Sequence, residues 1–170
     1  MIHSARLFAA AILTAGFSAG AFAQDQDSLD ALIDATYAVI SGGVGEQRDW
    51  DQMRSQFLPD GSMTVVNPRP DGTTLARTLT VDDYIEASSE FLMQVGFVER
   101  ETRRATYIYG EVATVLSAYE GYRTDTDEVF VTGVNTFVAV WTEGEWKIAS
   151  INWRNGVAIP VEDAFIDRAE

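Results

Sequence analysis

Charged side chains between Glu99 and Arg104 are the first residues of this sequence whose types and spacing suggest chemistry. Side chains alternate between the two faces of a strand, so Glu99, Glu101 and Arg103 are predicted to share one face and Arg104 to lie on the other. In a partly buried site, a carboxylate beside an arginine stays ionised, and a second carboxylate with a raised pKa can act as a general acid or base. Glu99 and Glu101 are therefore candidate catalytic residues. The alternative is a ladder of ion pairs on the solvent side of the sheet.

Asn135 is a second candidate, because it lies in the middle of a segment that otherwise favours a strand, Val134-Asn135-Thr136-Phe137. Asparagine is a poor strand former, so its presence calls for a reason. One reason is a hydrogen bond to a ligand. The other is a β-bulge next to Gly133, since glycine within a strand often marks one.

Aromatic residues are concentrated in the last strands, and Tyr119 and Trp153 are the ones we place in a pocket. Such rings would suit a small apolar or aromatic ligand that a few polar groups orient. With Arg103 and Asn135 they make up the predicted ligand-binding set. The alternative is that the aromatic rings fill the core or a dimer face.

The lack of cysteine and the single histidine limit the chemistry that is available. The chain has no cysteine, and its one histidine, His3, lies in a segment predicted to be removed. Catalytic triads with histidine, His-ligated zinc and imidazole acid-base catalysis are therefore excluded from the mature protein. The acids Asp125, Asp127 and Glu128 lack the glycine and the distant glutamate of a calcium loop, which favours a solvated turn. We expect no metal site and no cofactor.

Residues 1–23 have the pattern of a cleavable signal peptide: Arg6, an apolar run over residues 7–22, and Ala21-Phe22-Ala23 before the cleavage point. A membrane anchor is the competing interpretation, but about 20 apolar residues are needed to span a bilayer. We expect a periplasmic or secreted protein, without membrane attachment after cleavage. The formal net charge of −14 disfavours nucleic acid as a partner, because that binding depends on neutralising phosphates.

Residues 24–156 are predicted to form one domain, followed by a tail over residues 157–170. Apolar residues at helical spacing predict three helices: one begins at Asp27 or Ser28 and ends before Gly42, one begins after Asp49 and ends at the turn Pro59-Asp60-Gly61, and one covers 81–95. Thr80 and Asp83 resemble a capping box for the third helix. A strand pair is predicted over 62–67 and 73–79.

Four longer strands are predicted after the third helix, over 97–109, 111–123, 129–141 and 145–155. Short turns join them, so each must pair antiparallel with its neighbour in sequence. The product is a curved meander with helices on one face. In the tail, residues 161–168 are compatible with a short helix.

Several segments resemble the nuclear transport factor 2 (NTF2-like, or SnoaL-like) superfamily. Phe57 with Asp60 and Gly61 matches the entry to its first strand, and 133–137 and 146–153 are similar to its closing strands. The resemblance covers about 29–156. It implies an α+β cone of three helices packed on a strongly curved, mostly antiparallel sheet, and homodimers that form through the outer face of the sheet. Family enzymes commonly use an Asp-His pair, or Tyr and Asp, inside the cone, and the mature chain lacks the histidine.

Three functions are left open, and the sequence does not decide whether the protein is an enzyme. The first is binding of a small apolar or aromatic molecule in the cone. The second is a lyase or isomerase in which Glu99 or Glu101 is the base, while Tyr119 or Asn135 donates a hydrogen bond to an enolate oxygen. The third is a non-catalytic dimeric interaction module.

Overall fold

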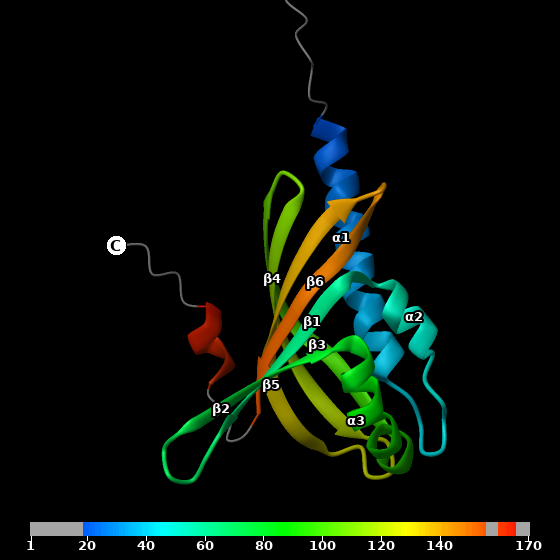
Figure 1. Ribbon diagram of the computed structural model, residues 1–170, viewed down its shortest axis with the longest axis vertical. Coiled ribbons are helices and arrows are strands. Elements are labelled where there is room, and N and C mark those ends of the chain that lie inside the picture. Colours follow the sequence, from blue (N-terminus) through cyan, green and yellow to red (C-terminus); the bar gives the residue numbers. More distant parts are fainter. Residues whose placement is uncertain (1–18, 156–159, 166–170) are drawn as a thin grey trace, which may run out of the picture.

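The computed structural model describes residues 19–155 and 160–165, which form an α+β domain. In this part of the chain, a six-stranded sheet has the order β2-β1-β6-β5-β4-β3. Figure 1 shows that the long strands bend strongly and that α1, α2 and α3 lie on the same side of the curved sheet. The predicted fold class is confirmed. Its strands are β1 Phe57–Pro68, β2 Thr74–Thr80, β3 Phe97–Tyr109, β4 Val112–Arg123, β5 Val129–Thr142 and β6 Glu145–Arg154.

The helices are α1 Ala19–Ile40, α2 Trp50–Ser55 and α3 Val81–Val95. Two of the predicted caps are confirmed: Asp49 accepts a hydrogen bond from a backbone N–H at the start of α2, and Thr80 forms a capping box with Asp83 at the start of α3. A capping box satisfies two N–H groups that the helix leaves unpaired. At the other end of α3, Gly96 adopts a φ of 58°, which glycine tolerates and other residues avoid.

The first helix differs from the prediction at its start. It begins at Ala19 and runs through the predicted caps Asp27 and Ser28. The residues before those caps are mainly alanine and glutamine, which are good helix formers, so a polar residue there need not start a helix. Part of α1 therefore overlaps the predicted signal peptide, whose residues 1–18 lie outside the described residues. Among the described residues, no helix is long and apolar enough to cross a membrane.

The predicted turn Pro59-Asp60-Gly61 is part of β1, which begins at Phe57. The pairing of β1 with β6 changes register between Phe57 and Ser62, so these three residues form an irregularity within the strand. Proline lacks the N–H that a regular ladder needs, and such a bulge accommodates it. Strand β1 pairs in parallel with β6, and the other neighbouring pairs are antiparallel. The sheet is therefore mostly antiparallel, as predicted.

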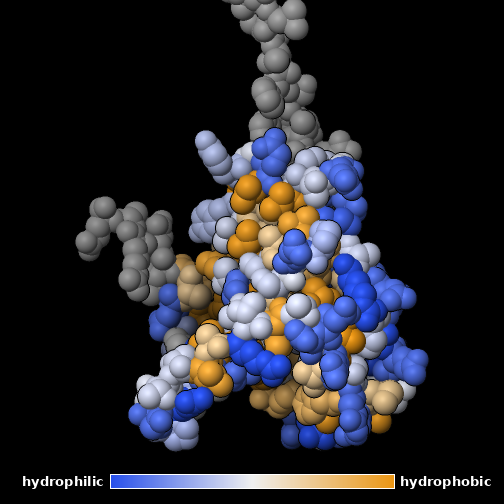
Figure 2. Space-filling view, in the orientation of Figure 1, coloured by the Kyte–Doolittle hydropathy of each residue, from blue (hydrophilic) through white to orange (hydrophobic). Residues whose placement is uncertain are grey.

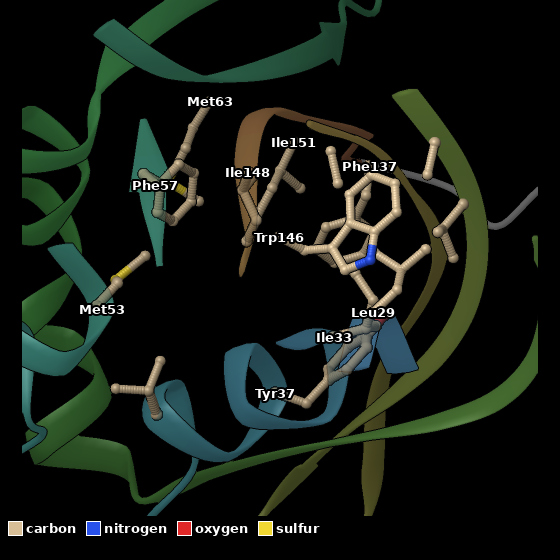
Figure 3. Packing of buried hydrophobic residues seen from close by; sticks show 14 of the residues in the cluster. Leu29, Ile33, Tyr37, Met53, Phe57, Met63, Phe137, Trp146, Ile148 and Ile151 are labelled. Atoms are coloured by element: carbon tan, nitrogen blue, oxygen red, sulfur yellow. The ribbon is translucent and has the colours of Figure 1, made fainter. Parts of the chain in front are cut away.

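Packing between α1 and the concave face of the sheet forms the main core. Leu29 and Ile33 on α1 are fully buried against strand residues such as Phe137 and Ile148. Figure 3 shows Leu29, Ile33 and Tyr37 along α1, facing the apolar side chains of the strands. The projecting tip of the β1–β2 hairpin is hydrophilic by contrast (Figure 2).

Arg48, in the loop before α2, is a buried charged residue that joins two helix ends. Its guanidinium donates to the backbone carbonyls of Ile40 at 3.0 Å, Gly42 at 2.9 Å and Leu92 at 3.1 Å. The last carbonyls of a helix have no partner within it, so these bonds satisfy groups that burial would otherwise leave unpaired. Arg48 thereby fixes the ends of α1 and α3 on either side of the segment that leads into β3.

Beyond residue 155, the structure describes a 3-10 helix over Val161–Phe165. A short helix was predicted over 161–168, and its last residues lie outside the described part of the chain. The 3-10 segment contacts β5, and the Arg103 guanidinium from β3 lies over the ring of Phe165.

Candidate functional site

A cavity of about 340 Å³ lies between the concave face of the sheet and the helices α1 and α3. Its walls come from segments far apart in the sequence: the three helices and the strands β1, β3, β4, β5 and β6. The helix residues are Thr36, Tyr37, Ile40, Met53, Tyr84, Ala87, Ser88, Phe91 and Leu92, and the remainder are Met63, Phe97, Glu99, Tyr119, Phe130, Val131, Asn135, Phe137, Ile151, Trp153 and Asn155.

Aliphatic and aromatic side chains make up most of these walls. Among the described residues that line the cavity, Glu99 is the only Asp, Glu, Lys, Arg or His. Phe91 and Phe130 also line it and are about half exposed, which places apolar rings where the cavity meets solvent. A largely apolar pocket with a few convergent polar groups is the usual form of a small-molecule site.

The end of α1 holds the beginning of β3, and this contact positions Glu99. The Glu99 backbone N–H donates to Ser41 Oγ at 3.0 Å, while Ser41 Oγ–H donates to the carbonyl of Tyr37 at 2.7 Å. One residue further, the Gly42 N–H donates to the carbonyl of Phe97 at 2.7 Å. These bonds join β3 to the helix end and place the Glu99 side chain in the cavity.

Inside the cavity, Glu99 accepts a hydrogen bond from Asn135, with 3.0 Å between Asn135 Nδ2 and Glu99 Oε1. Burial raises the pKa of Glu99 to about 7, since the apolar surroundings penalise its charged form, and the Asn135 hydrogen bond opposes this effect. Both the protonated and the ionised forms of Glu99 are therefore accessible near neutral pH. A general acid or base works best with a pKa in that range.

Two tyrosines lie near Glu99: Tyr84 comes from α3, and Tyr119 from β4, the strand that pairs with β3. Burial raises the pKa of both phenols, and the nearby charge of Glu99 raises it further. Each phenol therefore keeps its proton and can donate a hydrogen bond. Tyr84 packs edge-on against Trp153, with ring centroids 6.1 Å apart. Gly133 leaves room for Tyr119, because a Cβ at this glycine would lie 2.7 Å from the phenol oxygen.

Four of the predicted site residues come together in this cavity: Glu99, Tyr119, Asn135 and Trp153. For Asn135, the alternative of a β-bulge beside Gly133 is wrong. Gly133 pairs with Tyr119 and Asn135 pairs with Ser117 in an uninterrupted register, and the Asn135 side chain is buried.

Glu101 and Arg103, the other two predicted residues, do not line the cavity. Glu99 and Glu101 share the inner face of β3 as predicted, but Arg103 does not. A register shift between Glu101 and Arg103 interrupts the pairing of β3 with β4. An extra residue at a bulge reverses the alternation of side chains beyond it. Arg104 therefore lies beside Glu101, with 2.7 Å between Arg104 Nη2 and Glu101 Oε2. The Arg103 guanidinium instead lies 4.3 Å from the ring centroid of Phe165.

The alternative of an ion-pair ladder on the solvent side of the sheet describes neither glutamate: Glu99 lines the cavity, and the ion pairs around Glu101 lie between the sheet and α1. Arg104 connects Glu101 with two acids of α1, Asp30 at 2.6 Å and Asp34 at 2.5 Å. Glu101 also accepts a hydrogen bond from Ser117. This group is part-buried between α1 and the sheet, next to the cavity and outside its lining.

Three other aromatic residues of the last strands, and the acidic residue Asp125, lie outside the cavity. Tyr107 and Tyr109 are 65% and 91% exposed, and Trp146 is buried against Trp141 in the core, with ring centroids 5.6 Å apart. Asp125 pairs with Arg123 at 2.8 Å. Over residues 19–155 and 160–165, no three histidine, cysteine or acidic side chains are grouped closely enough to hold a metal ion.

Tyr37 and Tyr84 are cavity residues that the sequence did not identify. Both belong to the residues whose helical spacing predicts the first and third helices. The available signal was the phenol itself, because a buried tyrosine hydroxyl generally requires a hydrogen-bond partner. Tyr37 finds Ser117 at 2.6 Å and Asn135 at 3.2 Å.

The sequence matches no protein-family model, and no curated protein matches it significantly. The structure is similar to many solved structures. An NTF2-like protein with a cystatin-like fold from Novosphingobium aromaticivorans aligns with a TM-score of 0.65 at 14% identity, over 86% of this chain and 92% of that chain. The protein therefore has the NTF2-like fold.

Two further structures illustrate the range of proteins with this fold. One is a protein of unknown function from Mycobacterium tuberculosis, with a TM-score of 0.64 at 18% identity, over 91% of this chain and 83% of that chain. The other, from N. aromaticivorans, is proposed to be a scytalone dehydratase, with a TM-score of 0.60 at 13% identity, over 82% of this chain and 89% of that chain. At these identities the likeness establishes the fold, and function must be argued from the site.

Proposed function

We propose that the protein is an acid-base enzyme of the lyase or isomerase type, acting on a small, mainly apolar or aromatic carbonyl compound. In this proposal Glu99 is the catalytic base, and the reaction takes place in the cavity. The protein would work as a homodimer in the periplasm or outside the cell, after removal of residues 1–23.

One observation carries the proposal: a single carboxylate lies in an apolar cavity, where burial raises its pKa to about 7. A carboxylate that served only to hold the fold together would be expected beside a cation, as Glu101 is beside Arg104. The hydrogen-bond partner of Glu99 is instead the neutral side-chain amide of Asn135. The charged form is thus available at neutral pH without an ion pair that would reduce its basicity.

The surrounding groups suit removal of a proton next to a carbonyl. Glu99 would take the proton from the α carbon, and the electron pair of that C–H bond would move toward the carbonyl oxygen. Tyr84 and Tyr119 keep their protons and lie near Glu99, so either phenol can donate a hydrogen bond to the developing oxyanion. The proton on Glu99 can then return to another carbon or to a leaving hydroxyl, which gives an isomerase or a dehydratase respectively.

Similar structures are compatible with this reaction class. One structural neighbour is proposed to be a scytalone dehydratase, and another is proposed to be a dehydratase of the NTF2-like family from Streptomyces avermitilis. Both activities belong to those proteins. They support the proposal only in that proteins with the same fold are proposed to be dehydratases.

Binding without turnover is the second candidate function. It is favoured by the extent of the apolar lining and by the exposed rings of Phe91 and Phe130 at the opening. The two candidates share the cavity and differ in whether Glu99 exchanges protons with the ligand.

Hydrogen exchange in 2-tetralone separates the two candidates. This small aromatic ketone has acidic α hydrogens, whose exchange in D₂O can be followed by NMR. We expect the wild-type protein to accelerate exchange over buffer at pH 8. Ser88 lines the cavity and the adjacent Ser89 does not, so Ser88→Trp should abolish the acceleration and Ser89→Trp should preserve it.

The possible results of this experiment distinguish the two functions from each other and from neither. Acceleration that Ser88→Trp removes supports the enzyme. Binding of 2-tetralone by the wild type without accelerated exchange supports the binding function. Equal exchange in buffer, in the wild type and in both variants, with no binding, contradicts both.

A further inference from the structure

Four side chains form an unbroken line of hydrogen bonds that leads from the cavity carboxylate into the protein. Asn135 Nδ2 lies 3.2 Å from Tyr37 Oη, and Tyr37 Oη lies 2.6 Å from Ser117 Oγ. Ser117 Oγ in turn contacts Glu101 Oε1. Asn135, Tyr37 and Ser117 are all buried, with Ser117 completely inaccessible. The line therefore joins Glu99 to a second carboxylate, outside the cavity, through protein groups alone.

The donor and acceptor groups at the two ends fix which atom donates in every hydrogen bond of this line. At the cavity end, Asn135 Nδ2 is only a donor, so its two hydrogens go to Glu99 Oε1 and to the Tyr37 oxygen. The Tyr37 proton must then be donated to Ser117. At the other end, the Glu101 carboxylate is only an acceptor, so Ser117 donates to it and accepts from Tyr37. Both ends require the same arrangement of hydrogens.

The far end of the line is held firmly. Both carboxylate oxygens of Glu101 lie 2.9 Å from Arg104 Nε. Arg104 is itself bound to Asp30 and Asp34 of α1. A carboxylate fixed by a guanidinium stays an acceptor, so the direction of the line is fixed at this point.

We propose that Glu101 is a positioning residue for Glu99, acting through the two hydroxyls and the Asn135 amide that lie between them. Held in this way, the amide presents its N–H to the cavity carboxylate. If the line were broken, the amide could turn and place its carbonyl oxygen against Glu99. The consequence for catalysis rests on the proposed function, but the effect on the charge of Glu99 does not.

The expected effect on Glu99 has a definite sign. The hydrogen bond from Asn135 favours the charged form, so weakening it raises the pKa of Glu99. Among the residues that the structure describes, the other titratable groups near Glu99 are the phenols of Tyr37 from α1, Tyr84 from α3 and Tyr119 from β4. Burial raises the pKa of each of these phenols, so they remain neutral over the range in which Glu99 titrates.

The test is an NMR titration of the Glu99 side-chain carboxyl in protein labelled with ¹³C-glutamate, with the signal assigned by its loss in Glu99→Gln. We expect Ser117→Ala and Tyr37→Phe each to raise the titration midpoint of Glu99 by about one pH unit, because a hydrogen bond to a charged group has that order of strength. The double variant should shift the midpoint no further than the larger single shift, since both substitutions break the same line.

Ser150→Ala is the matched control, because Ser150 lies on β6, outside the line, and accepts a hydrogen bond from Asn152. Its Glu99 midpoint should equal that of the wild type. An unchanged midpoint in Ser117→Ala and Tyr37→Phe, or shifts that add in the double variant, would overturn the inference. If the midpoint moves as expected while 2-tetralone exchange is absent in the wild type, the positioning role stands and the proposed enzymatic function fails.

Discussion

Glu99→Gln is expected to slow hydrogen exchange in 2-tetralone by about 100-fold or more at pH 8, toward the rate in buffer. General-base catalysis contributes about 10² to 10⁴ in rate, and glutamine has no basic oxygen that can take up the proton. The substitution keeps the size of the side chain, so the cavity should still bind the ketone. Equilibrium binding of 2-tetralone to the variant, compared with the wild type, separates loss of chemistry from loss of the site.

The pH dependence of the wild-type rate provides a second check on the same assignment. The base is the ionised form of Glu99, whose pKa burial raises to about 7. Exchange catalysed by the protein should therefore rise as pH increases through about 7 and level off above it. Glu86→Gln, which changes an exposed glutamate of α3, is the matched control and should leave the profile unchanged. A Glu99→Gln variant as fast as the wild type would remove Glu99 from the mechanism.

The same substitution, Glu99→Gln, should lower activity but favour the folded state as pH rises. In the unfolded chain Glu99 has an ordinary pKa, near 4.5, and in the folded protein burial raises that pKa to about 7. Between these two values the folded state binds more protons than the unfolded state, so the contribution of Glu99 to stability falls as pH rises through this window. At pH 8 Glu99 should therefore destabilise the fold by about 3 kcal/mol relative to pH 4.5.

Urea unfolding of the wild type and of Glu99→Gln, at pH 4.5 and at pH 8, measures this effect. The other titrating groups are shared by both proteins, so the difference between the two free energies of unfolding isolates Glu99. We expect that difference to change by about 3 kcal/mol between the two pH values, in favour of the variant at pH 8. Glu86→Gln should show no such change. Removal of a functional residue that destabilises the fold commonly gives a more stable but inactive variant.

Local signals in the sequence were sufficient for much of the fold. Thr80 with Asp83 predicts the start of α3, and Gly96 predicts its end, because capping and positive φ values depend on residues next to each other in the chain. The four long strands and their antiparallel order follow in the same way from alternating patterns and short turns. The parallel pairing of β1 with β6 joins distant segments, and no local pattern indicates it.

The site was predicted less completely, and β3 shows why. Regular alternation placed Glu101 and Arg103 with Glu99, but a bulge after Glu101 turns Arg103 away and brings Arg104 to the inner side. A bulge arises from the way two strands pair, so the sequence of β3 alone does not locate it. The inward direction of Glu99 likewise depends on the contact with Ser41, at the end of a helix 58 residues earlier.

Tyr37 and Ser117 illustrate a second limit. Helical spacing correctly places Tyr37 on the buried face of α1, yet that pattern does not show which group its hydroxyl meets. Ser117 is a small polar residue that packing buries completely. Their hydrogen bond joins positions 80 residues apart, and it becomes visible only when helix and sheet are packed together.

The proton affinity of Glu99 is the property on which the proposed catalysis and the pH dependence of stability both depend, and it is the quantity that Glu101 is expected to shift. Its most direct measurement is the NMR titration of the Glu99 carboxyl in the wild-type protein, without any ligand. The buried position beside Asn135 predicts a midpoint of about 7. A midpoint near 4.5, the ordinary value for a glutamate, would mean that the carboxylate is well solvated, and it would contradict the account.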